Sequence, residues 1–156
     1  MNIARFLKEQ RIDLELDALF DDDERPASME LLTAHMCSLL EQSEQIVNAT
    51  RLRTDLMNAQ RRDPSLLGQG LAMPHVRTLQ ARRPVLAVGV SRAGLPLDTP
   101  DDEPVRLVIA LVGPSYDDKQ YLQIYKLLSE RLLQDGTLEA VLGADEPGQV
   151  VRALSG

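Results

Sequence analysis

The sequence predicts a layered α/β domain, with helices on either side of a sheet of short strands. Two stretches rich in Val, Ile and Leu, residues 84–92 and 104–113, each begin at a proline and are separated by turn-forming residues, as neighbouring strands often are. Segments with apolar residues at helical spacing come before and after them. The 156 residues, 44% of them apolar, are enough for one continuous core, so we expect a single domain over residues 1–156.

Apolar residues at helical or alternating spacing divide the first half of the chain into four elements. We expect a helical turn at 3–7, a half-buried strand at 12–16, an amphipathic helix from 29 to about 43, and a second helix over 46–59. Ser28 is placed to cap the first long helix, and Pro64 with the glycines after it prevents a longer second one. The acidic run at 21–24 is short enough to be an ordinary loop.

The second half contains the strands and three further helices. Residues 71–73 are apolar but few, and the stretch 104–113 is apolar enough to be buried on both faces of a sheet. A helix is expected from Asp117 or Asp118, either of which can cap it, to Gly136, with Tyr121 and Tyr125 on its apolar stripe. Two short helices, at 138–142 and 149–154, end the pattern.

The composition excludes several classes of protein. A net charge of −7 argues against nucleic acid as a partner, because phosphate backbones attract basic surfaces. The apolar stretches are far shorter than the roughly 20 residues that cross a bilayer, and no apolar signal core opens the sequence, so we expect a cytoplasmic protein without membrane insertion. The single cysteine, Cys37, excludes an internal disulfide and a cysteine-built zinc site, and the two histidines lack paired carboxylates at metal-ligand spacing, so we expect no disulfide and no metal site.

The two histidines differ in setting. His35 lies on an apolar helical stripe, between Leu31 and Leu39, and is interpreted as structural. His75 follows Pro74, which stiffens the backbone before it.

The stretch GQGLAMPHVR, residues 68–77, surrounds His75 with features that suit an anion. Gly68 and Gly70 allow backbone N–H groups to approach a ligand closely, and a neutral imidazole nitrogen can act as a nucleophile. The alternative is a structural histidine at the end of a strand, with its hydrogen bonds made within the protein. Five arginines flank this histidine, either as solvated surface residues or as the source of a positive field: Arg61, Arg62, Arg77, Arg82 and Arg83.

The motif GQGLAMPH resembles the Gly-x-Gly-x-Ala-x-Pro-His signature of the enzyme IIA domains of the phosphotransferase system, in the fructose, mannitol and nitrogen-regulatory class. Residues 94–114 and the helix containing YLQIYKLLSERL are similar to the segments that follow it in that family. The resemblance implies a mixed sheet of parallel and antiparallel strands flanked by helices on both faces. It also implies that His75 accepts a phosphoryl group from HPr or its nitrogen-branch counterpart. The acceptor would be a IIB domain or a regulated target protein.

The sequence departs from the family pattern before the histidine. Ala59 and Gln60 occupy the positions of a common Arg-Glu pair, and Arg61 or Arg62 compensates only if the end of that helix is also remodelled. The family has a Ser-Thr pair before the motif glycines, and Ser65 supplies the one hydroxyl that remains at these positions. We therefore predict that Ser65, Arg61 and Arg62 bind phosphate, together with Gly68 and Gly70.

A second departure lies in the later helix, where Tyr121 stands in place of a second histidine. A tyrosine can donate a hydrogen bond but cannot become a cation, so it would neutralise a phosphoryl group less well. Tyr121 is either a core aromatic or a phosphate-binding residue. In the second case its hydroxyl should lie within hydrogen-bond reach of His75 or of a phosphate bound there.

Two functions remain open. The first is a IIA-type phosphocarrier, a stand-alone regulator of the nitrogen branch rather than one piece of a sugar permease, which requires no cofactor because the donor supplies the phosphoryl group. In that case the chain is a phosphohistidine phosphotransferase component. The second is a degenerate IIA-like regulator that binds proteins without turning over phosphate. In both cases the surface around His75 is the partner face.

Overall fold

The computed structural model describes residues 2–20 and 27–156, and in that part of the chain six strands form one mixed sheet flanked by helices on both faces. The predicted fold class is therefore confirmed. The acidic run at 21–24, expected to be a loop, lies outside the described residues. The strands are β1 (Ile12–Asp13), β2 (Leu66–Gly68), β3 (Leu71–Ala72), β4 (His75–Thr78), β5 (Val85–Leu95) and β6 (Val105–Pro114).

The sheet is built around the antiparallel pair β5 and β6, which correspond to the two apolar stretches that the sequence predicts as strands. Strand β1 pairs parallel with β5, while β3 and β4 both pair parallel with β6. Strand β2 pairs antiparallel with β3 at the edge. Strand β4 joins β6 with His75 opposite Leu111, so the histidine begins a strand that lies beside the central strand β6.

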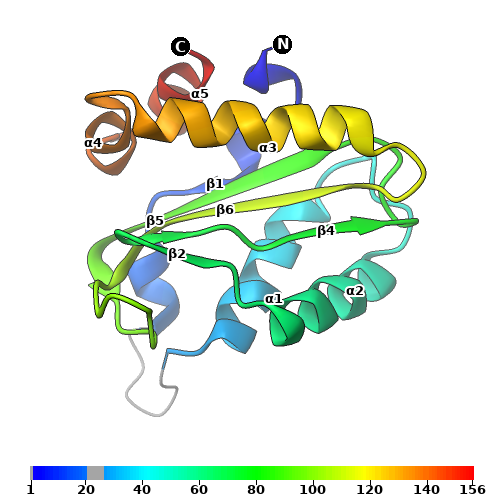
Figure 1. Ribbon diagram of the computed structural model, residues 1–156, viewed down its shortest axis with the longest axis horizontal. Helices are drawn as coiled ribbons and strands as arrows, with labels where there is room; N and C mark the ends of the chain where they lie inside the picture. Colours follow the sequence, from blue (N-terminus) through cyan, green and yellow to red (C-terminus); the bar gives the residue numbers. More distant parts are fainter. Residues whose placement is uncertain (1, 21–26) are drawn as a thin grey trace.

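The helices divide between the two faces of the sheet (Figure 1). Helices α1 (Met29–Leu40) and α2 (Ala49–Arg62) cover one face, and α3 (Asp118–Leu133), α4 (Thr137–Leu142) and α5 (Pro147–Ser155) cover the other. Alternate residues of β6 pack toward opposite sides, as a strand of period two requires. Leu107, Ile109 and Leu111 contact the α3 side, whereas Val108, Ala110 and Val112 contact the α1 side. The expectation that this strand is buried on both faces is confirmed.

Local capping explains where the helices begin. The side-chain oxygen of Ser28 accepts a hydrogen bond from the N–H of Leu31 at 3.1 Å, as predicted. Asn48 does the same for Arg51 at 3.0 Å, so α2 starts three residues later than the spacing predicts and extends to Arg62. Asp117 caps α3 through the N–H of Lys119. Cys37 is fully buried in α1, and this burial raises the pKa of its thiol to about 11.

The N-terminal segment corrects one expectation. It contains three short 3₁₀-helices, η1 (Ile3–Arg5), η2 (Glu9–Arg11) and η3 (Leu16–Phe20), in addition to β1. The predicted strand over 12–16 is wrong after Asp13, because the chain turns into η3 and buries Leu16 against β5. Asp17 holds this turn by accepting hydrogen bonds from the side chain of Ser91 and the N–H of Ala93.

Candidate functional site

A cavity of about 560 Å³ lies where the end of α2, the start of β4 and the first turn of α3 meet. The residues that carry its chemistry come from segments far apart in the sequence, and they are Arg62, Asp63, Ser65, His75, Arg77, Ser115, Asp118 and Tyr121. Two cationic and two anionic side chains thus surround one partly buried histidine. The site is assembled by the parallel pairing of β4 with β6, which brings His75 beside the strand that leads into α3.

His75 is held in one orientation by its own backbone neighbourhood. Its Nδ1 atom lies 2.7 Å from the carbonyl oxygen of Met73. A carbonyl only accepts hydrogen bonds, so Nδ1 carries the proton and Nε2 keeps a free lone pair. The ring of Tyr125 packs edge-on against the imidazole, with 5.5 Å between the ring centroids. The hydrogen bond to Met73 therefore occupies Nδ1 and leaves Nε2 as the ring nitrogen available to act as a nucleophile.

Ser65 lies directly beside His75. Its Oγ is 3.4 Å from Nδ1 of His75 and donates to the carbonyl of Asp63 at 3.3 Å. Its backbone has a φ of 56°, a left-handed conformation that side chains other than glycine rarely adopt. Two further hydrogen bonds maintain this conformation, one from its N–H to the Asp63 carboxylate and one from the N–H of Met73 to its carbonyl. The strained loop therefore places a hydroxyl at the histidine.

The arginines separate into two groups. Arg62, in the last turn of α2, and Arg77, two residues after His75 on β4, line the cavity. Nη1 of Arg77 lies 3.3 Å from the carboxylate of Asp118 at the start of α3. Arg61 is not among the cavity residues, and its guanidinium pairs instead with Glu30 of α1 at 3.3 Å. Of these two predicted phosphate-binding arginines, Arg62 lines the cavity of His75 and Arg61 does not.

The two motif glycines do not line the cavity. Gly68 and Gly70 form the turn between β2 and β3, with φ values of 80° and 81° that favour glycine. The carbonyl of Gly70 accepts hydrogen bonds from the N–H groups of Arg106 and Leu107, which joins the turn to β6. The conformation of this turn, rather than contact with the histidine cavity, accounts for both glycines in the structure.

Tyr121 is a buried core aromatic that also lines the cavity, and its phosphate-binding role stays a prediction. Its side chain is 5% exposed, lies against Gly113 of β6, and lines the cavity with its ring centroid 6.5 Å from that of His75. Burial raises the pKa of its hydroxyl, so the group stays neutral. In the described part of the chain, that hydroxyl makes no hydrogen bond to His75. The residue closes one wall of the site without supplying charge.

Sequence reasoning missed Tyr125 and Asp118 as site residues and did not separate Arg77 from the other arginines. Tyr125 follows Tyr121 by four residues on a helix, so both rings lie on one face, and this spacing was a usable signal. Arg77 follows His75 by two residues on a strand, which places both side chains on one face. That signal was lost because β4 was not predicted.

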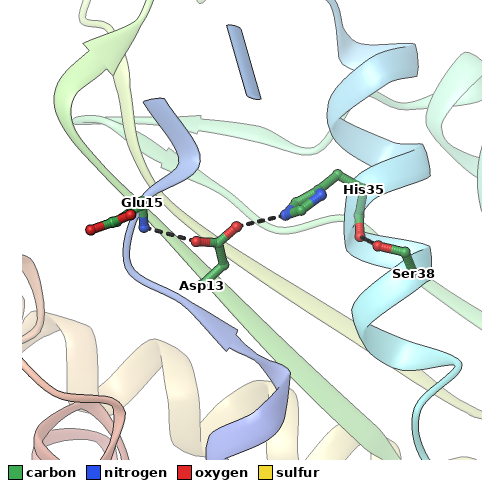
Figure 2. Close-up of polar contacts among 4 residues, drawn as sticks. All are labelled: Asp13, Glu15, His35 and Ser38. Carbon is green, nitrogen blue, oxygen red and sulfur yellow. Dashed lines mark hydrogen bonds and ion pairs between the residues drawn. The ribbon is translucent and has the colours of Figure 1, made fainter. Parts of the chain in front are cut away.

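The other histidine has a structural role, as expected. Nε2 of His35 lies 2.7 Å from a carboxylate oxygen of Asp13, so the pair ties α1 to β1, as Figure 2 shows. The other Asp13 oxygen accepts a hydrogen bond from the N–H of Glu15 at 2.8 Å. The hydrogen bond from His35 lowers the pKa of Asp13 despite partial burial.

Asp13→Asn is expected to lower the free energy of unfolding by about 1 kcal/mol at neutral pH and to remove part of its acid dependence. Folded Asp13 has a lowered pKa and therefore binds fewer protons than the unfolded chain as the pH falls. Its stabilising contribution is complete above the unfolded value of about 3.9 and disappears below the folded one. Urea unfolding between about pH 5 and about pH 2 tests this. An unchanged slope of stability against pH in Asp13→Asn contradicts it.

Across the described ranges, no group of three or more His, Cys, Asp or Glu side chains is arranged to hold a metal ion. In the same residues, no helix is long and apolar enough to cross a membrane. The fold and the site together define an α/β protein with a partly buried histidine in a cavity that two arginines line.

Comparison with known proteins identifies the family. The family model described as "Phosphoenolpyruvate-dependent sugar phosphotransferase system, EIIA 2" matches residues 15–156. The chain belongs to this family, which confirms the resemblance carried by the motif at His75. Among curated relatives, the "PTS system fructose-specific EIIA component" of Haloferax volcanii is 29% identical over 89 residues, which are 57% of this chain and 58% of that protein.

A second relative, the "PTS system fructose-specific EIIABC component" of Bacillus subtilis, is 20% identical over 155 residues. The match includes 99% of this chain but 23% of that protein, so the chain spans less than two thirds of the length of each of these two relatives.

Solved structures share the fold. Nitrogen regulatory protein IIA-Ntr from Neisseria meningitidis aligns with a TM-score of 0.81 at 23% identity, over 97% of this chain and 98% of that one. IIA mannitol from Escherichia coli aligns with a TM-score of 0.71 at 18% identity, over 94% of this chain and 97% of that one.

Proposed function

We propose that this chain is a IIA-type phosphocarrier that accepts a phosphoryl group on Nε2 of His75. The observation that carries the proposal is the 2.7 Å hydrogen bond from Nδ1 to the carbonyl of Met73, which leaves Nε2 as the nucleophile. The donor is the phosphohistidine of HPr or of its nitrogen-branch counterpart. We also propose that residues 1–156 form one such domain and act in the cytoplasm.

The transfer needs positioning and charge neutralisation more than bond-making groups from the protein. The lone pair of Nε2 forms a bond to phosphorus while the phosphorus–nitrogen bond of the donor breaks, and the leaving imidazole keeps that electron pair. The ring of His75 gains positive charge, which the Met73 carbonyl stabilises by accepting from Nδ1–H. Arg62 and Arg77 face the same cavity and are assigned to the phosphoryl oxygens.

The acceptor is a IIB domain or a regulated target protein, and we favour a stand-alone regulatory role. One similar solved structure carries the name nitrogen regulatory protein IIA-Ntr, and another is a complex of the mannitol IIA with phosphorylated IIB from Escherichia coli. The surface around His75 is the proposed partner face. Leu122, which lines the cavity and is 56% exposed, is part of this proposed face.

A second function, binding of partner proteins without phosphate turnover, is favoured by one specific observation. Gln60, at the position of the family's acidic residue, is buried, and its Nε2 donates to the carbonyl of Pro64 at 3.2 Å. This residue supports the loop before Ser65 and is not among those that line the cavity. Tyr121 likewise contributes no charge.

Phosphorylation of the pure chain distinguishes the two functions. With enzyme I, HPr or its nitrogen-branch counterpart, and phosphoenolpyruvate, we expect intact-mass spectrometry to find one acid-labile phosphoryl group. His75→Ala should lose it entirely, because no other ring nitrogen lies in the cavity, whereas the matched control His35→Ala should keep it. Undiminished labelling of His75→Ala shows that the residue is wrongly assigned. No labelling with cognate donors favours the binding regulator.

A further inference from the structure

A second cavity, of about 310 Å³, lies among the N-terminal segment, the turn between α1 and α2, and the start of β5. It shares no lining residue with the cavity of His75. The charged residues that line it are Arg5, Lys8, Arg11 and Glu44, and the uncharged polar ones are Gln10, Gln42, Ser43 and Gln45. Its volume is at the lower end of the range found for small-molecule sites, about 300–1,000 Å³.

Arg11 is the unusual residue of this cavity. It is 5% exposed, yet no carboxylate in residues 2–20 and 27–156 forms an ion pair with it. Its Nε donates to the carbonyl of Leu86 at 3.0 Å and its Nη2 to the carbonyl of Phe6 at 3.1 Å. These bonds fix the plane of the guanidinium and leave Nη1 without a hydrogen bond to the described residues.

Most of the Arg11 side chain is withdrawn from water, but Nη1 is not among the described buried atoms that lack a hydrogen-bond partner, so this nitrogen is still open to solvent and to a ligand. Backbone carbonyls compensate Arg11 in part, and burial lowers the pKa of its guanidinium. An anion in the cavity would complete the compensation at Nη1. The guanidinium is already held rigidly, so little conformational freedom would be lost when the anion binds.

The other charged residues of the cavity also favour an anion. Arg5, Lys8 and Arg11 contribute three positive charges and Glu44 one negative charge, in a chain whose net charge is −7. Gln42 and Gln45 add amide groups that can donate to oxygen. A local excess of cations on an acidic protein raises the local concentration of anions.

We propose that this cavity binds a small oxyanion, a phosphate or carboxylate group, with Nη1 of Arg11 as its central donor and Lys8 and Arg5 around it. Because Nε and Nη2 of Arg11 are occupied, the anion meets the guanidinium through Nη1 alone and takes its remaining bonds from the neighbouring side chains. The site is independent of phosphoryl transfer at His75, with which it shares no residue.

The test uses the whole chain and two probes, inorganic phosphate and citrate, added at constant ionic strength so that general screening is unchanged. NMR of the arginine side-chain Nε–H groups follows binding, since the Arg11 Nε–H is buried and bonded to Leu86. We expect a saturable shift of the Arg11 signal with at least one probe. The response to phosphate, to citrate or to both identifies the anion class.

Two matched variants locate the site. Lys8→Gln should weaken binding about fivefold, the effect of losing one exposed charge partner, and Lys126→Gln on α3, which makes the same change of charge elsewhere, should leave it unchanged. Both positions are exposed, so both variants should fold. A linear response without saturation for both probes, or equal weakening in the two variants, overturns the proposal.

Discussion

Replacing Arg62 with glutamine is expected to slow phosphorylation of His75 by about 100-fold, the usual cost of removing one donor that stabilises transition-state charge. Arg61→Gln, one residue earlier, should change the rate by no more than about twofold, as surface substitutions away from a site do. The two arginines end the same helix, but only Arg62 lines the cavity, and Arg61 pairs with Glu30.

This pair of variants separates positioning from long-range attraction. Both remove one positive charge from the same helix turn, so both alter the field that steers an anionic partner to nearly the same extent. Rapid-quench measurement of transfer from a saturating phosphohistidine donor removes most of the remaining dependence on steering. Equal slowing of both variants would mean that Arg62 acts through the general field and not at the phosphoryl oxygens.

Much of the fold could be predicted because its strongest signals are local. Ser28 and Asp117 cap helices where their side chains suggest, and the apolar runs at 84–92 and 104–113 form the central strands β5 and β6. The two short C-terminal helices also lie within one or two residues of their expected ranges.

The strands around the motif could not be predicted in the same way. Strands β2 and β4 have three and four residues, and β4 pairs with β6 through contacts distant in the sequence, such as His75 with Leu111. Alternation of apolar and polar residues is uninformative over so few positions.

The same limit explains the outcome at the site. Gly68 and Gly70 lie near His75 in the sequence, but their turn is bonded to β6 at Arg106 and Leu107 and neither glycine lines the cavity. Arg61 and Arg62 are indistinguishable as residue types, and only the end of α2 decides which one reaches the histidine. Ser65, His75 and Tyr121 do meet, as the motif and the helix stripe implied.

Leu16 shows how a tertiary contact overrides a local pattern. Its alternation with Ile12 and Leu14 favours a strand, yet it begins η3 and is fully buried against Gly89 of β5. A Cβ atom at residue 89 would lie 2.6 Å from one Leu16 methyl carbon and 2.9 Å from two further Leu16 carbons. The absence of a side chain at Gly89 is therefore what allows Leu16 to pack there.

A double-mutant cycle between these two residues is expected to show strong coupling. Gly89→Ala should lower the free energy of unfolding by about 1–3 kcal/mol through overpacking, and Leu16→Ala by about 2–5 kcal/mol through loss of buried contacts. The double variant should lose at least about 1 kcal/mol less than the sum, because the alanine at 89 fills space that the shorter side chain vacates.

Urea unfolding of the four proteins at one pH measures the coupling, provided that the dependence on urea concentration is the same in all of them. Leu133→Ala, at a leucine that is 82% exposed, should change stability by less than about 0.5 kcal/mol and so gives the cost of the same substitution without burial. Strict additivity of the two single changes would mean that β5 or η3 shifts to accommodate the alanine at 89 without using the space of Leu16. The segment after Asp13 would then owe its 3₁₀ conformation to the hydrogen bonds of Asp17 rather than to the contact with Gly89.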